Sequence, residues 1–180
     1  MIRINMGCGW RNFGSGWVHI DAGEYDHLDY KSITDLSQFD DDSVDLIYAS
    51  HVIEYFDRED ILGILKEWNR VLIPGATLRV AVPNFQQIAK LYNDGQHGLN
   101  SFVGLLYGKM TMGDQTIYHK TVYDFDSLSE VLEKVGFKKV RFYDWRDTSH
   151  ALFDDHSQAY LPHMNKENGE LMSLNVEATA

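Results

Sequence analysis

The feature that most constrains the fold is the alternation of short apolar runs, rich in branched residues, with amphipathic stretches. This alternation is typical of an α/β fold, in which helices join the strands of a mostly parallel sheet. The runs predicted as strands are residues 2–6, 17–21, 45–50, 78–82, 138–143 and 173–178, and a further strand at 30–33 is left open. The 180 residues suffice for one well-buried domain, so we expect a single domain over 1–180.

Two of the intervening stretches predict helices. In the first, apolar residues recur at helical spacing at Ile61, Leu62, Leu65, Trp68 and Leu72. Asp57 is the expected N-cap of this helix, and Pro74-Gly75 is its expected stop. In the second, Ser127 and Glu130 have capping-box spacing, and Gly136 should close the helix before a strand at about residue 138.

The connections between the predicted elements are of unusual length. Residues 7–16 are near the minimum for a parallel crossover, so the first crossover helix should be reduced or absent. Residues 144–172 form a long connector before the last strand. A missing helix leaves one face of the sheet uncovered near the first strand. We expect either the connector or a second subunit, in a homodimer, to cover it.

Composition excludes several classes of partner. A formal charge of −11 and a pI near 5.0 argue against nucleic acid, whose binding needs clustered Lys and Arg. We expect no membrane partner, because no stretch approaches the roughly 18 apolar residues that span a bilayer. Cys8 is the single cysteine and permits no internal disulfide, which suits a cytoplasmic location.

Chemistry enters at the segment Asn5-Met-Gly-Cys-Gly9, directly after the first predicted strand. Glycine permits positive φ and lets backbone N–H groups approach a ligand. Asp21, at the end of the second strand, could accept hydrogen bonds from both ribose hydroxyls of a nucleoside. It follows Gly9 by 21 − 9 = 12 residues, whereas an NAD site has its acidic residue about 20 residues beyond the glycines. This spacing disfavours a dehydrogenase.

The order of these features resembles that of class I methyltransferases dependent on S-adenosylmethionine (SAM), specifically the compact group with the type 11 methyltransferase domain. The resemblance covers nearly the whole chain. The segments that carry it are Asn5-Met-Gly-Cys-Gly9, residues 17–21, Thr34-Asp35-Leu36, residues 43–55, residues 70–75 and residues 128–137. The sequence departs from the family pattern in Trp10-Arg11, which replaces a third glycine, and in Tyr55, where this group often has His.

The resemblance implies a Rossmann-like three-layer fold around a seven-stranded sheet of order 3-2-1-4-5-7-6, with strand 7 antiparallel. It also implies SAM as the cofactor, bound at the carboxyl ends of the strands, in agreement with the rule for open α/β sheets. The residues implied to bind SAM are Gly7, Cys8 and Gly9 in the loop, Asp21 at the ribose, Asp35 and Leu36 at the adenine, and Ser50 and His51 near the sulfonium. Cys8 is expected to be a small buried residue of this loop without a catalytic role.

Three histidines are candidates for a general base: His119, His156 and His163. Each could instead be structural. The connector also contains His150, Asp154 and further ligand types suited to zinc or iron, but their spacing matches no specific motif. We therefore predict no metal site.

The predicted function is methyl transfer from SAM to an oxygen or nitrogen of a sugar or small polar metabolite, by in-line displacement with a histidine removing the acceptor's proton. One alternative is a catalytically inactive SAM- or nucleoside-binding domain that acts as an interaction module, which Trp10-Arg11 favours. Another is a transferase that moves a different group from a related nucleoside.

Overall fold

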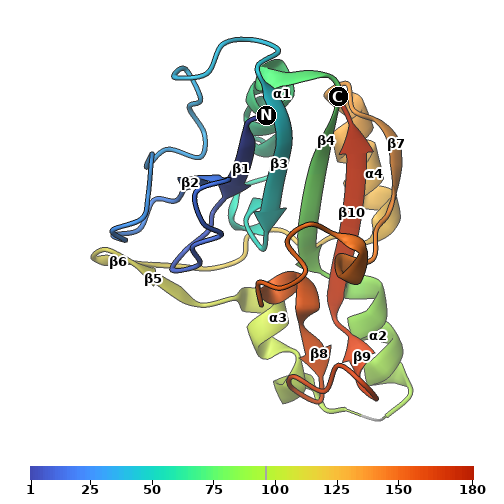
Figure 1. Ribbon diagram of the computed structural model, residues 1–180. Helices are drawn as coiled ribbons and strands as arrows, with labels where there is room; N and C mark the ends of the chain where they lie inside the picture. Colours follow the sequence, from blue (N-terminus) through green and yellow to red (C-terminus); the bar gives the residue numbers. More distant parts are fainter. Residues whose placement is uncertain (96) are drawn as a thin grey trace.

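The computed structural model describes residues 1–95 and 97–180, and its centre is a six-stranded sheet of order β2-β1-β3-β4-β10-β7 (Figure 1). The strands of this sheet are β1 (Arg3–Met6), β2 (Val18–Ile20), β3 (Val44–Ser50), β4 (Leu72–Pro83), β7 (Lys138–Phe142) and β10 (Ser173–Thr179). Strands β2, β1, β3 and β4 are parallel, and β10 runs antiparallel to both of its neighbours, β4 and β7. The order and the antiparallel strand agree with the expected Rossmann-like fold.

The expected seventh strand, at 30–33, is reduced to a single parallel bridge between Ile20 and Tyr30. The N–H of Asp21 donates to the carbonyl of Tyr30 at 3.3 Å, and the chain then leaves the sheet. The edge beside β2 therefore ends in one bridge, and the sheet has six strands instead of seven.

Helices cover one face of the sheet and its lower end. The helices are α1 (Ile61–Val71), α2 (Phe85–Asn93), α3 (Val103–Tyr107) and α4 (Phe125–Lys134). Helices α1 and α4 pack side by side on the same face, behind the sheet in Figure 1. Two small antiparallel pairs complete the fold, β5 (Met110–Met112) with β6 (Gln115–Ile117) and β8 (Tyr160–Leu161) with β9 (Glu170–Leu171).

Both predicted helix starts need correction. Asp60, and not Asp57, precedes α1, and the Asp57 carboxylate instead accepts from Lys120 Nζ at 2.8 Å. Helix α4 begins three residues early, because Asp124 is its N-cap and forms the capping box with Ser127. Its predicted end is confirmed, since Gly136 has a φ of +107° just beyond the last turn.

Strand β4 begins earlier than predicted, at Leu72, directly after α1. Pro74 and Gly75 lie within the strand as the structure assigns it, where Gly75 has a φ of +90° and donates its N–H to the Ala180 carbonyl at 3.0 Å. The register against β3 shifts between Val44 and Leu46. The Pro-Gly pair thus ends the helix as expected, but it forms an irregular start to β4 and not a separate turn.

Cross-strand register gives the two faces of the sheet opposite chemistry. The row Ile4, Ile47, Leu78 and Ala178 faces α1 and α4 and belongs to the main apolar core. The adjacent row, on the opposite face, carries mostly polar side chains: His19, Asn5, Tyr48, Arg79, Glu177 and Arg141. Side chains alternate between faces along a strand, so each of these strands carries both chemistries.

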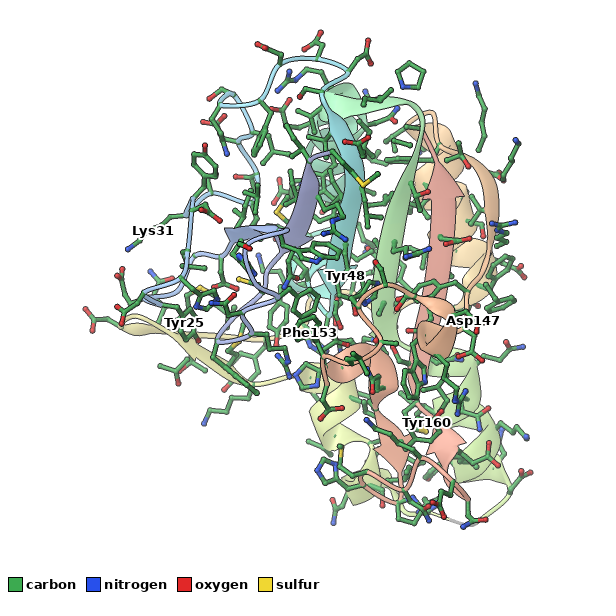
Figure 2. The ribbon with its side chains drawn as sticks, viewed as in Figure 1. Tyr25, Lys31, Tyr48, Asp147, Phe153 and Tyr160 are labelled. Atoms are coloured by element: carbon green, nitrogen blue, oxygen red, sulfur yellow. The ribbon has the colours of Figure 1, made fainter. Side chains whose placement is uncertain are left out.

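The connector covers the second face. Residues 7–17, all of which the structure describes, contain no helix, as predicted. In its place Phe13 and Trp17 form a cluster with Tyr48 of β3, and Phe153 of the connector stacks on Phe13 at a centroid distance of 4.4 Å. Figure 2 labels Tyr48 and Phe153 where the connector crosses the front of the sheet. The homodimer alternative stays a prediction, which sedimentation would test.

Within the residues described, no helix combines the length and the apolar character needed to cross a membrane.

Candidate functional site

The parallel strands β1, β2, β3 and β4 end at the same edge of the sheet, which is the lower edge in Figure 1. The glycine segment follows β1, Asp21 follows β2, and Ser50 and His51 stand at the end of β3. The structure therefore brings the predicted residues Gly7, Cys8, Gly9, Asp21, Ser50 and His51 to one edge.

The two loop glycines are required for different reasons. Both have positive φ, +64° at Gly7 and +56° at Gly9. A Cβ at Gly7 would collide with the side chain of Val52, so this glycine permits close packing after β3. At Gly9 no described atom lies within 4 Å of a Cβ position, which leaves open space for a ligand. Gly9 is therefore the position of the loop against which a cofactor can lie.

The backbone N–H groups of this loop are bonded within the chain. Those of Gly7 and Cys8 donate to the Ile20 carbonyl at 2.7 and 3.3 Å. That of Gly9 donates to Asp21 Oδ2 at 2.7 Å. These N–H groups are therefore already used within the protein, contrary to the expectation that they approach a ligand. A bound cofactor would instead contact the open side of Gly9 and the Asp21 carboxylate.

Asp21 is the anchor of the loop. Its Oδ1 accepts from the Gly23 N–H at 2.7 Å, so each carboxylate oxygen holds one backbone group. Each oxygen keeps a second lone pair for a hydroxyl donor. The side chain is nearly buried, with 8% of its surface exposed at the loop. Asp21 can therefore hold the loop and a ribose at the same time.

Cys8 is buried between these residues, and burial together with the charge of Asp21 raises its pKa to about 12. A neutral thiol is a poor nucleophile. Cys8 therefore packs within the loop, in agreement with its lack of an expected catalytic role.

The predicted adenine residues separate in the structure. Asp35 is exposed, and its carboxylate accepts from the Ser37 N–H at 3.0 Å, a bond that lowers its pKa. Leu36 is fully buried in the apolar core, and its N–H donates to Glu67 Oε1 at 3.1 Å. Asp35 is free to meet a ligand, whereas the side chain and the N–H of Leu36 are used within the protein.

A buried cluster follows β3 and was not predicted. Glu54, in the 3-10 turn Ile53–Tyr55, is fully buried, with Oε1 at 3.3 Å from His51 Nδ1 and 3.8 Å from His119 Nε2. Neither of its carboxyl oxygens has a hydrogen-bond partner among the described residues. Burial raises the pKa of Glu54 to about 8. The carboxyl group is therefore mainly protonated at neutral pH.

Two histidines, His51 and His119, face this carboxyl, and a third, His156, lies beside the ring of His51. The rings of His51 and His156 lie 5.1 Å apart, and His119 contributes to the same cluster from the segment before α4. Loss of surrounding water lowers the pKa of all three, including His156, whose residue surface is partly open to solvent but whose ring packs beside His51. Repulsion between the rings is a further cause for His51 and His119, and the charge of Arg11 for His156. All three are therefore mainly neutral at pH 7, the form that accepts a proton. His51 also has a φ of +56°, uncommon for a residue with a side chain.

His163 lies outside the cluster. It is exposed on the connection between β8 and β9, at the end of the molecule away from β1 and β2 (Figure 1). Of the three predicted bases, the structure brings His119 and His156 to the site and leaves His163 apart.

The connector brings His156 to the site through its neighbour Asp155. Asp155 Oδ2 accepts from the Tyr48 hydroxyl at 2.6 Å, and Oδ1 accepts from the Ser157 N–H at 2.8 Å and lies 3.3 Å from Ser50 Oγ. Arg11 adds a bond from the glycine loop to the Asp154 carbonyl at 2.9 Å. Arg11 therefore helps to hold the connector over the site.

Sequence reasoning missed Glu54 and Asp155 as site residues. The available signal for Glu54 was its position three residues after His51, between the apolar Ile53 and Tyr55. Over residues 1–95 and 97–180, no three His, Cys, Asp or Glu side chains converge in an arrangement that could hold a metal ion.

Comparisons with known proteins agree with this geometry. The family described as "Methyltransferase domain" matches residues 21–80, a third of the chain that runs from Asp21 into β4. A search of curated proteins finds no significant match.

Solved structures share the fold. A SAM-dependent methyltransferase from Archaeoglobus fulgidus aligns with a TM-score of 0.59 and 16% identity, over 99% of this chain and 86% of the other. A 1,6-didemethyltoxoflavin N1-methyltransferase from Burkholderia thailandensis, solved with bound 1,6-didemethyltoxoflavin and S-adenosylhomocysteine, aligns with a TM-score of 0.57 and 10% identity, over 99% of this chain and 70% of the other. A methyltransferase from Mesorhizobium loti gives 0.54 and 16%, over 99% and 90%.

The chain has the Rossmann-like fold that it shares with solved SAM-dependent methyltransferases, and residues 21–80 match the methyltransferase-domain family. The matched segment begins at Asp21 and runs through Ser50, His51 and Glu54. The open space at Gly9 and the spare acceptors of Asp21 fit SAM as the cofactor.

Proposed function

We propose that the chain transfers the methyl group of SAM to an oxygen or nitrogen of a sugar or small polar metabolite, with His156 as the general base. Asp21 would hold the ribose, the open side of Gly9 the methionine part, and Asp35 the adenine. Ser50 and His51 would lie near the sulfonium. When bound, SAM supplies an electrophilic methyl group. The protein has to orient the acceptor and remove its proton.

The observation that carries this proposal is the position of His156. It is an exposed histidine, placed beside His51 at the edge where Ser50 and Asp21 also end. His51 and His119, by contrast, have almost fully buried side chains, 9% and 4% exposed. An acceptor can therefore reach His156 more readily than the two inner histidines.

A depression on the neighbouring half of the same edge supports a small polar acceptor. Its volume is about 370 Å³, within the usual range for small-molecule sites. Most of its lining is polar or aromatic, including Asn84, Tyr143, Trp145, Arg146, Ser173 and Asn175. Ser173 also lies 3.5 Å from His51 Nε2 and so joins the depression to the histidine cluster.

Calorimetric titration with SAM and S-adenosylhomocysteine tests the cofactor half of the proposal. We expect Asp21→Asn to weaken binding by about 10-fold to 100-fold, because a hydrogen bond to a charged acceptor contributes about 1.5–3 kcal/mol. Asp26→Asn, an exposed aspartate on the same loop, is the matched control and should bind as the wild type does. Failure of the wild type to bind either compound at millimolar concentration would overturn the proposal.

Methyl transfer from SAM to a panel of hexoses, amino sugars and small hydroxylated amines tests the catalytic half. His156→Ala should lower kcat by about 10²-fold to 10⁴-fold without weakening SAM binding, as expected for loss of a general base. His163→Ala removes an exposed histidine of the same connector and should leave the rate unchanged. Binding of SAM without turnover of any acceptor would favour the inactive interaction module, for which the internally bonded glycine loop is the supporting observation.

A further inference from the structure

Two histidine rings face one carboxyl oxygen of Glu54. The hydrogen bonds on the far sides of these rings determine whether that carboxyl group is protonated or charged. Oε1 lies 3.3 Å from His51 Nδ1 and 3.8 Å from His119 Nε2. Carboxylates beside histidines commonly accept a ring N–H. At this site the opposite arrangement holds.

The tautomer of His119 follows from its contact with Leu105. His119 Nδ1 lies 3.0 Å from the Leu105 carbonyl oxygen, which can only accept a hydrogen bond. Nδ1 therefore carries the hydrogen, and in the neutral ring Nε2 is a bare lone pair. That lone pair is the atom nearest to Glu54 Oε1.

The tautomer of His51 follows in the same way from a chain of polar contacts. Asn175 donates its Nδ2 to the Ser157 carbonyl at 2.9 Å, so its Oδ1 accepts, and it does so from the Ser173 hydroxyl at 2.9 Å. With its hydrogen so directed, Ser173 Oγ is an acceptor for His51 Nε2 at 3.5 Å. His51 Nδ1 is then the bare nitrogen, and it too faces Oε1.

An ionised Glu54 would place a negative oxygen against two lone pairs in a buried site, without a compensating donor. The Glu54 charge also acts on the hydroxyls of Tyr55 and Tyr123, and the Tyr55 hydroxyl donates to the Gly108 carbonyl at 2.7 Å. The Lys120 ammonium is bound to Asp57 at 2.8 Å. A hydrogen on the carboxyl group relieves the conflict, because it removes the negative charge and can be donated to one ring nitrogen at a time, that of His51 or that of His119. The raised pKa of Glu54 agrees with this geometry.

We propose that Glu54 is a positioning residue: its carboxyl hydrogen bonds the bare nitrogen of His51 or His119, holds these rings against their far-side bonds and, through His51, sets the ring of His156 at the site. The consequence for catalysis rests on the proposed function, whereas the tautomers do not. Gly108 belongs to the same arrangement, since a Cβ there would collide with the His119 ring.

Three variants test whether Glu54 acts as a hydrogen-bond donor or as a negative charge. Glu54→Gln keeps a hydrogen-bond donor of the same size, Glu54→Met keeps the volume without a donor, and Glu59→Gln is a control at an exposed glutamate nearby. Imidazole ¹⁵N NMR of the protein without SAM reports which ring nitrogens carry hydrogen. We expect Nε2-H for His51 and Nδ1-H for His119 in all four proteins, because the far-side bonds fix these tautomers. In Glu54→Met alone, the bare His51 Nδ1 should take the chemical shift of a ring nitrogen that accepts no hydrogen bond.

In the methyl-transfer assay, Glu54→Met should lower kcat by about 10²-fold through misplacement of the base. It should also shift the acidic limb of the pH profile, while Glu54→Gln restores most of the rate. Loss of activity in Glu54→Gln equal to that in Glu54→Met would show that a charged carboxylate is needed and would overturn the proposal. Reversed tautomers in the wild type would overturn it whether or not Glu54→Met folds. Failure of SAM to bind would leave the NMR result intact, so the two proposals fail separately.

Discussion

The two faces of the central sheet are built in different ways. The face toward α1 and α4 is apolar, and its rows of Ile, Leu, Val and Ala form one large cluster. The face under the connector carries Asn5, His19 and Tyr48 in one cross-strand row, and its apolar cluster has three buried members. Buried titratable groups such as His19, His150 and Asp155 lie on this second face. One face therefore supplies most of the stability, and the other supplies directed contacts to the site.

The largest effect is expected on the helical face. Trp68 of α1 is fully buried, and its Nε1–H donates to the Ile33 carbonyl at 2.8 Å. Trp68→Ala should lower the free energy of unfolding by about 3–5 kcal/mol, measured by urea denaturation. Trp17→Ala, on the connector face, should cost less because its cluster is smaller. Equal costs would contradict the difference between the faces.

A smaller but more localised effect is expected at Asp155. Asp155→Ala removes the acceptor of the Tyr48 hydroxyl and the Ser157 N–H, and it should cost about 2–3 kcal/mol. Hydrogen exchange should then accelerate in residues 144–172 and remain slow in α1 and α4. Asp154→Ala, which removes an exposed pair with Lys166, is the control and should cost less than about 1 kcal/mol. Uniform acceleration across both faces would contradict a local role.

The pH dependence of stability should originate from the edge and the connector face. The pKa of Glu54 is about 8 in the folded chain and ordinarily 4.5, so the folded state keeps a proton that the unfolded chain loses between these values. The free energy of unfolding therefore falls as pH rises through this window. The histidines with lowered pKa act in the opposite direction, since their contribution is lost as pH falls below 6.5.

Between pH 6.5 and 8 the Glu54 effect is thus largely isolated and should amount to about 2 kcal/mol. Urea denaturation of the wild type and of Glu54→Gln across this range checks it. The neutral glutamine should remove the slope, and an unchanged slope in the variant would assign it to another group.

The smallest effect is expected at Arg11. Arg11→Gln removes the exposed bond to the Asp154 carbonyl and should cost about 0.5–1 kcal/mol. Exchange should increase in the connector near Asp154 more than elsewhere. If hydrogen exchange in the connector stays as slow in this variant as in the wild type, Asp155 and not Arg11 fixes the connector to the sheet.

Much of the fold could be predicted from residue pattern. The alternation of apolar runs located all six strands of the main sheet, and the short first connection predicted the missing helix. The start of β4 could not be predicted, because Pro74 and Gly75 usually end an element and here lie within one. The start of α4 could not be predicted either, because Asp124 and Ser127 are both favourable N-cap residues and the local sequence does not distinguish them.

The site was predictable where motif order carried it. Gly9, Asp21, Ser50 and His51 come together because parallel strands end at one edge. The role of Glu54 could not be predicted, because it depends on the nearby ring of His119, which is distant in sequence. That ring has room beside Glu54 because Gly108 has no Cβ. Leu36 shows the reverse problem, since an apolar residue in a binding motif can equally be part of the core.

The position of β10 has a consequence for the order of assembly. This strand, the last along the chain, lies between β4 and β7 and pairs with both. During synthesis, β7 and α4 leave the ribosome before the strand that attaches them to the rest of the sheet. Strands β2, β1, β3 and β4 are parallel neighbours and can pair before β10 is synthesised. Strand β7 pairs only with β10, so until then its backbone has no partner strand. The nascent chain therefore passes through a stage in which a partly formed sheet is exposed, and the final seven-residue strand completes it.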